Sequence, residues 1–199
     1  MGTRRSDTES AQSFGASRNH AFRIRLRVQE RLKMKLALYG KSCTGKTTVS
    51  NLLAEQLGVG ARHCGDLVKE ASIDVGCSPG ALPISLHRQI DSQTRDVVFN
   101  ATGDTLIEGA FLDQVFADVA GCILIRLTCS TPERTKRFAL RETAMSLQDR
   151  DDSDERLRNE LFSGARLTTP TIEIDTTELT PLETAKCIME WLHQHKPGS

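Results

Sequence analysis

The chain has 199 residues, of which 38% are hydrophobic and 26% charged, as in a globular domain with a sizeable core. No apolar run approaches the roughly 20 residues of a membrane-spanning helix, so we expect no membrane insertion. Basic and acidic residues balance at 26 each, but residues 1–33 hold eight basic and three acidic residues (+5), which leaves −5 for residues 34–199. This distribution argues against a nucleic-acid partner. Six cysteines without a Cys-x-x-Cys pair indicate reduced thiols in a cytoplasmic protein.

Residues 1–33 are rich in Arg, Ser, Gly and Asn and show no sustained hydrophobic periodicity. We expect a disordered leader there and assign it no function. An Arg- and Ser-rich leader is also typical of a mitochondrial transit peptide, an interpretation that Asp7 and Glu9 weaken. A third interpretation takes Met34, which opens the first predicted strand, as the natural start. The folded domain is expected over residues 34–199.

A phosphate-binding loop follows the first predicted strand, residues 34–39. It fits the pattern Gly-x-x-x-x-Gly-Lys-[Ser/Thr] and leads into an amphipathic helix over residues 48–57. A chance match on a Gly- and Ser-rich turn is disfavoured by this strand and helix. The candidate nucleotide-binding residues are Gly40, Lys41, Ser42, Cys43, Thr44, Gly45, Lys46, Thr47 and Thr48.

The residue types in this loop suit a nucleoside triphosphate. Gly40 and Gly45 permit backbone angles that turn successive N–H groups inward, which makes an anion site at a helix N-terminus. Lys46 supplies a compact positive charge for the β- and γ-phosphates, and the Thr47 hydroxyl is placed to bind Mg²⁺. We therefore expect ATP and Mg²⁺ as cofactors.

Two segments after the first helix are candidates for binding an acceptor. A brief strand or turn leads through Gly65-Asp66 into a helix, and Asp66 either lies at the ligand-binding edge of the sheet or caps that helix. A polar helix over residues 84–95 carries four polar residues at helical spacing: His87, Arg88, Asp91 and Arg95. They either line a substrate cleft or form a solvated face with ion pairs, and their pattern alone favours the solvated face.

The C-terminal half continues the alternation of strands and helices. Glu108 lies near the end of strand 104–109, where an acidic residue would meet the Mg²⁺ shell. Strand 122–129 is mostly apolar, as buried parallel strands are. The next helix places Arg134, Arg137 and Arg141 on one stripe, which suits a phosphate clamp. A charge run over 145–158 is expected to form a solvated helix pair or a lid. Strand 171–177 and a helix from Thr180 complete an α/β fold with four or five parallel strands.

The order of these features over residues 34–192 resembles the nucleoside monophosphate kinases, and among them the cytidylate kinase family. The resemblance rests on the phosphate-binding loop, Gly65-Asp66-Leu67, His87-Arg88-Gln89-Ile90-Asp91 with Arg95, Ile107-Glu108-Gly109, the three arginines of helix 131–141, Asp149-Arg150-Asp151-Asp152-Ser153-Asp154 and Ile174-Asp175-Thr176-Thr177. It implies a P-loop NTPase core with a roughly five-stranded parallel sheet. It also implies an acceptor-binding segment near 65–100, a lid near 134–158 that includes Arg150, and phosphoryl transfer from ATP to a pyrimidine nucleotide.

One position departs from the family pattern. Similar kinases follow the Glu-Gly pair with an Arg that holds the acceptor's phosphate, whereas this chain has Ala110. Arg62, Arg88 or Arg95 could replace that cation, or the acceptor lacks a phosphate and the enzyme is a nucleoside, antibiotic or other small-metabolite kinase.

The leading hypothesis is a monomeric kinase acting on CMP, dCMP or a close analogue. Lys46 and the loop amides would hold the triphosphate, Thr47 with Glu108 or Asp66 would organise Mg²⁺, and the arginines would neutralise developing charge. Asp66 would be the base for a hydroxyl acceptor. The alternative from another class is a nucleotide-dependent switch, which the lack of an Asn-Lys-x-Asp motif disfavours.

Overall fold

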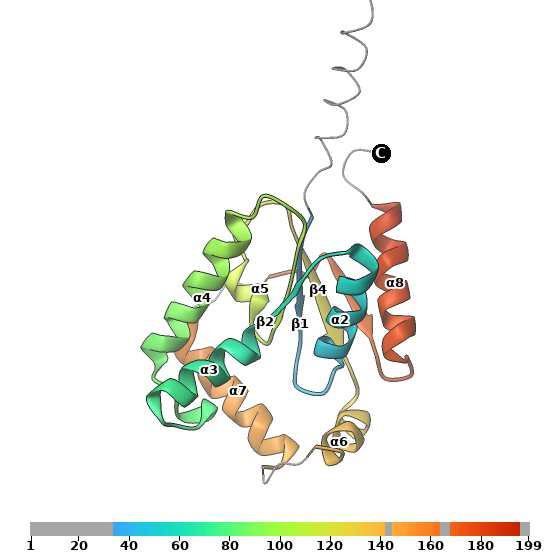
Figure 1. Ribbon diagram of the computed structural model, residues 1–199. Coiled ribbons are helices and arrows are strands. Elements are labelled where there is room, and N and C mark those ends of the chain that lie inside the picture. The colour runs from blue at the N-terminus through green and yellow to red at the C-terminus, as the bar shows by residue number, and fades with distance from the viewer. Residues whose placement is uncertain (1–33, 142–144, 164–167, 196–199) are drawn as a thin grey trace, which may run out of the picture. The chain divides into compact units, whose positions relative to one another are not determined.

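The computed structural model describes residues 34–141, 145–163 and 168–195; the expected leader, residues 1–33, lies outside them. Strands and helices alternate along most of the chain (Figure 1). In order, the elements are β1 (Lys35–Tyr39), α2 (Lys46–Leu57), β2 (Ala61–His63), α3 (Cys64–Val75), the 3-10 helix η1 (Pro79–Ala81), α4 (Ile84–Phe99), β3 (Thr105–Gly109), α5 (Leu112–Val115), β4 (Cys122–Thr128), α6 (Thr131–Ala139), α7 (Leu147–Leu161), β5 (Ile172–Asp175) and α8 (Pro181–Gln194).

The five strands form one parallel sheet in the order β2-β3-β1-β4-β5. The central strand β1 pairs Leu36 with Leu106 on one side and with Ile123 on the other. This confirms the expected P-loop NTPase fold with a five-stranded parallel sheet. Because all strands run in the same direction, their carboxyl ends share one edge, and ligands of open α/β sheets bind there.

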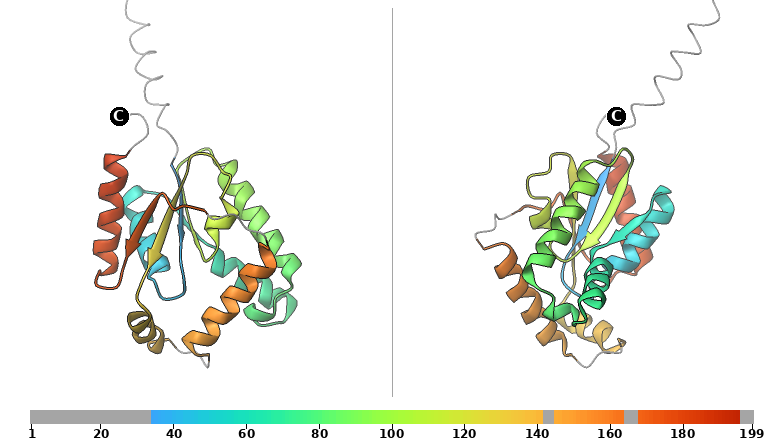
Figure 2. Two further views of the ribbon diagram at one scale, coloured as in Figure 1. Left: turned by 180° about the vertical axis from the view of Figure 1, so that it is seen from behind. Right: turned by 60° about the vertical axis from the view of Figure 1, so that its left-hand side comes forward.

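Alternate residues of each strand enter two different cores. One core joins Leu36, Leu38 and Leu53 to Ile188 of α8, and the other joins Tyr39 and Ile107 to residues of α4 and α5. Figures 1 and 2 show the corresponding layers, with α2 and α8 on one face of the sheet and α4 and α5 on the other. Burying the apolar side chains of both cores stabilises the fold by roughly 25 cal/mol for every Å² of apolar surface removed from water, which offsets the conformational entropy lost on folding.

Several helix boundaries differ from the sequence-based expectation. The expectation that Asp66 caps a helix is wrong, because His63 is extended and α3 begins directly at Cys64, which puts Asp66 in its first turn. Ser130 is the N-cap of α6. The charge run forms a single helix, α7, whose start is a reciprocal capping box between Ser146 and Asp149. In the part of the chain that is described, no helix is long and apolar enough to cross a bilayer.

Candidate active site

The phosphate-binding loop packs tightly against the end of β4. Gly40 has φ +146°, and a Cβ there would lie 2.2 Å from the backbone oxygen of Leu127, so only glycine fits. Gly45 has φ +89° and is the N-cap of α2. Cys43 also adopts a positive φ, 64°. These angles give the loop the shape in which backbone N–H groups can converge on an anion.

Lys46, the first residue of α2, places its ammonium beside the loop backbone. Its Nζ donates to the carbonyl oxygen of Lys41 at 2.8 Å. Burial lowers the pKa of Lys46; the charges of Glu108 and Asp154 oppose this effect, and those of Arg141 and Arg150 reinforce it. A cation desolvated in this way gains from an incoming phosphate, because the anion replaces the water that the ammonium has lost.

Glu108 lies at the carboxyl end of β3, where two side chains contact the same oxygen. Thr47 Oγ1 donates to Glu108 Oε1 at 3.2 Å, and His63 Nδ1 lies 3.2 Å from that oxygen. The two predicted metal residues, Thr47 and Glu108, are therefore adjacent. Hydroxyl and carboxylate oxygens suit Mg²⁺, which takes one or two protein ligands together with substrate phosphates. Among the described residues, no group of three His, Cys, Asp or Glu side chains could hold a metal ion.

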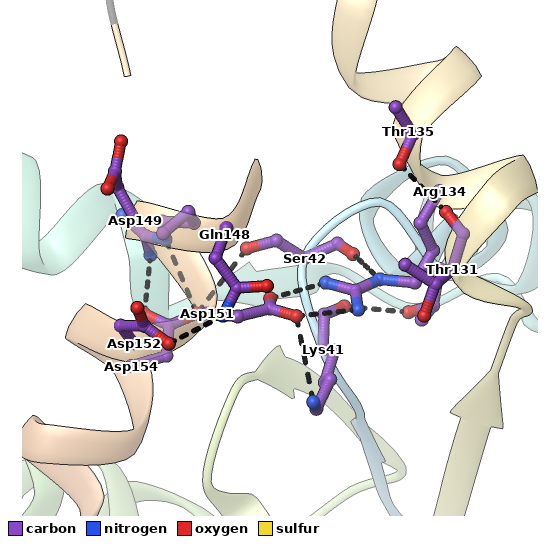
Figure 3. Close-up of polar contacts among 12 residues, drawn as sticks. Lys41, Ser42, Thr131, Arg134, Thr135, Gln148, Asp149, Asp151, Asp152 and Asp154 are labelled. Atoms are coloured by element: carbon purple, nitrogen blue, oxygen red, sulfur yellow. Dashed lines mark hydrogen bonds and ion pairs between the residues drawn. The ribbon is translucent and has the colours of Figure 1, made fainter. Parts of the chain in front are cut away.

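A buried ion pair within the lid segment, residues 134–158, lies against the phosphate-binding loop (Figure 3). Arg134 is 3% exposed and binds both carboxylate oxygens of Asp151, at 2.8 and 2.5 Å. Its Nε donates to the carbonyl oxygen of Ser42 at 2.8 Å. Lys41 Nζ lies 3.6 Å from Asp151, and Ser42 Oγ donates to Asp154 at 3.5 Å. The carboxylates of Asp151 and Asp154 thus lie beside the loop. They contact the side chains of Lys41 and Ser42, which are expected to bind phosphate.

The other arginines of the lid segment have different surroundings. Arg137 donates to Thr176 Oγ1 at 3.2 Å and to its backbone oxygen at 2.7 Å, and it also binds Glu133, so it ties α6 to the end of β5. Arg141 is exposed at the end of α6. Arg150 pairs with Asp154 at 3.1 Å. Arg141 and Arg150 thus combine at least partial exposure with an electrostatic effect on Lys46.

A cavity of about 660 Å³ lies between the carboxyl ends of β1 and β4, the segment 110–114 and α7. Its wall carries Asp113, which is 5% exposed and accepts from Arg158 at 2.6 Å and from Gln114 at 2.9 Å. Tyr39 and Phe111 add aromatic surface. No sequence motif indicated Asp113 or Arg158, and the only available signal was the position of Asp113 shortly after a strand end.

The predicted acceptor-binding residues of α3 and α4 do not line this cavity, although all of them are described. The side chain of Asp66 is 56% exposed and pairs with Lys69. Arg88 donates to the backbone oxygen of Glu160, and Arg95 is bound to Asp118 and to the backbone oxygen of Val115. Asp66 is therefore exposed on α3, and Arg88 and Arg95 contact neighbouring segments of the chain.

Two residues of α4 are better enclosed. His87 is 7% exposed, and burial lowers its pKa. Burial raises the pKa of Asp91 to about 6. Burial also raises the pKa of the nearby Cys64 thiol to about 12, and the Asp91 charge adds to this rise. Perturbed pKa values cluster at functional sites, so Asp91 is a candidate functional residue although it does not line the cavity.

Comparison with known families assigns this fold. A family model described as an AAA domain, AAA_18, matches residues 36–158. The chain belongs to this family. The matched range of the AAA domain begins in β1 and ends in α7, so it includes the phosphate-binding loop, Glu108 and the Arg134–Asp151 pair. No curated protein matches the chain.

Solved structures similar to this AAA domain agree in fold. An uncharacterized protein from Eubacterium ventriosum is 14% identical with a TM-score of 0.60, and the match covers 82% of this chain and 100% of that one. A gluconokinase from Sinorhizobium meliloti is 15% identical with a TM-score of 0.58, over 84% and 95% of the two chains. A shikimate kinase from Acinetobacter baumannii, solved with shikimate, is 17% identical with a TM-score of 0.55, over 83% and 96%.

Proposed function

We propose that this AAA domain protein is an ATP- and Mg²⁺-dependent phosphotransferase acting on a small molecule. The observation that carries the proposal is the grouping, at one sheet edge, of Lys46, the Thr47–Glu108 contact and a lid segment next to a 660 Å³ cavity. A nucleotide switch has no need of such a cavity beside its phosphate site. The gluconokinase and shikimate kinase of similar fold support this reaction class.

In this mechanism the chain contributes position and charge. The loop amides and Lys46 hold the β- and γ-phosphates, and Arg141 and Arg150 neutralise charge that develops on the transferred group. Mg²⁺, when bound by Thr47 and Glu108, shields the phosphate oxygens. The helix α7 lines one wall of the cavity and would limit the access of water to bound ATP. No covalent intermediate on the protein is needed.

For the acceptor, the resemblance to cytidylate kinases favours CMP or dCMP. Such a monophosphate presents its own nucleophilic oxygen and requires no strong base. A hydroxyl acceptor is the second candidate, and it is favoured by Ala110, which lines the cavity where similar kinases carry an arginine. A hydroxyl requires a base, and the candidate from the sequence, Asp66, is exposed and does not line this cavity.

The test is ADP production from ATP and Mg²⁺ with a panel of nucleosides, nucleoside monophosphates and sugar acids, using Lys46→Ala as the inactive control. Acceptor-dependent ADP release from wild type alone is the expected result. ADP release that no acceptor stimulates would instead indicate a switch or an ATPase. We also propose that the protein is a monomer, and that it is cytoplasmic, since its six cysteines are all unpaired.

A further inference from the structure

His63 is a residue to which no sequence motif pointed. It is the last residue of β2, and the parallel register places it directly opposite Glu108 of β3. Its side chain is 19% exposed and that of Glu108 is 7% exposed. Neighbouring residues of parallel strands point to the same face, so the sheet itself sets the 3.2 Å contact between His63 Nδ1 and Glu108 Oε1.

The chemistry of the contact sets the direction of the hydrogen bond. A carboxylate only accepts hydrogen bonds, so Nδ1 of His63 must carry the proton and donate it. Thr47 Oγ1 donates to the same oxygen, Oε1. Among the described residues, no hydrogen bond reaches Oε2. The two donors therefore fix the carboxylate in one orientation and leave its second oxygen open to a metal ion or a metal-bound water.

Without the histidine, Glu108 has another cation to approach. Lys46 is desolvated, and the Glu108 carboxylate is the strongest opposite charge acting on it. If Glu108 turned toward Lys46, the pair would neutralise the ammonium that the phosphates need and remove the carboxylate from Thr47. The hydrogen bond from His63 holds Glu108 on the Thr47 side.

We propose that His63 is a positioning residue for the divalent cation: it orients Glu108 so that Thr47 and Glu108 can hold Mg²⁺ together with the nucleotide. This inference rests on the proposed function. Partners that hydrogen-bond to a metal ligand typically change metal affinity by about 10- to 100-fold when they are removed. Nucleotide binding without metal depends on the loop and Lys46, and it should change less than about twofold.

The experiment compares His63→Ala, His63→Asn and His63→Gln. The amide nitrogen of Asn takes the place of Nδ1, whereas that of Gln takes the place of Nε2. His193→Ala, an exposed histidine of α8, is the matched control. Calorimetric titration of a non-hydrolysable ATP analogue, with Mg²⁺ and with EDTA, measures nucleotide and metal binding without turnover. The Mg²⁺ dependence of the reaction rate gives a second readout.

We expect His63→Ala and His63→Gln to require about 10-fold or more Mg²⁺, and His63→Asn to stay close to wild type. EDTA titrations and melting temperatures should be similar for all. Unchanged Mg²⁺ dependence in His63→Ala, or better rescue by Gln than by Asn, would overturn the inference while the kinase proposal stands. A wild-type protein that binds the analogue with Mg²⁺ but transfers phosphate to no acceptor would instead refute the proposed function.

Discussion

The ion pair between Arg134 and Asp151 leads to a prediction about nucleotide binding. Asp151→Asn keeps the shape of the side chain but removes its charge and one of the two acceptors that Arg134 uses. The guanidinium, 3% exposed, would then lack a counter-charge. Removing one partner of a fully buried pair costs about 3–5 kcal/mol. Because the Asp151 side chain is 17% exposed, we expect a smaller loss of about 2–3 kcal/mol in the free energy of unfolding.

At about 2–4 °C per kcal/mol for a domain of this size, the melting temperature should fall by roughly 4–12 °C. ATP should restore much of the loss, because its phosphates can supply the anion that Arg134 then lacks. Nucleotide should therefore raise the melting temperature more in Asp151→Asn than in wild type. The measurement is differential scanning calorimetry with and without Mg²⁺ and a non-hydrolysable ATP analogue.

Asp152→Asn is the matched control, since this neighbour in α7 is exposed and contacts Gln148 on its own helix. The pH dependence provides a further check. Arg134 holds the pKa of Asp151 below its ordinary value, so the stability it contributes is present above about pH 4 and is lost as pH falls further. The difference between wild type and variant should thus shrink below pH 4. If Asp151→Asn melts like Asp152→Asn, or if nucleotide stabilises it no more than wild type, this reasoning is refuted.

Three further substitutions test other parts of the site. Lys46→Ala should abolish phosphoryl transfer in a coupled assay without lowering the melting temperature, because burial already penalises the ammonium; near wild-type turnover would contradict the loop assignment. Asp91→Asn should raise the melting temperature more at pH 7.5 than at pH 4.5. Burial raises the pKa of Asp91 from the ordinary value of 3.8 to about 6 in the folded state. The ionised carboxylate therefore destabilises the fold as pH rises from about 4 to above 6, by at most roughly 3 kcal/mol. An equal effect at both pH values would argue against burial as the cause. If the natural acceptor is a monophosphate, Ala110→Arg should lower the KM for CMP or leave it unchanged. If the acceptor offers a hydroxyl instead, the same substitution should raise the KM for cytidine. If the wild-type protein does not phosphorylate CMP and Ala110→Arg does not either, the monophosphate kinase hypothesis is excluded.

Local patterns in the sequence were enough for the fold and for the phosphate-binding loop. The strand before Gly40, the glycine spacing and the capping box at Thr180 each act within a few residues, and the structure agrees with all of them. The parallel direction of the four or five expected strands also followed from the alternation of strands and helices, since a crossover connection makes consecutive strands parallel. The adjacency of Thr47 and Glu108 could be expected for a related reason, because Glu108 lies at the carboxyl end of β3 and Thr47 follows the loop at the carboxyl end of the neighbouring strand β1.

The contacts that specify the site depend on tertiary structure. The same charge run could have formed a solvated surface, and its packing as α7 against the loop determines that Asp151 meets Arg134. The pairing of β2 with β3 determines that His63, rather than Asp66, reaches Glu108. These pairs join residues between 17 and 45 positions apart, so their geometry depends on strand order and helix packing. Helical spacing alone makes Arg134 and Arg137 equivalent, but only the folded chain places one against the lid carboxylate and the other against Thr176.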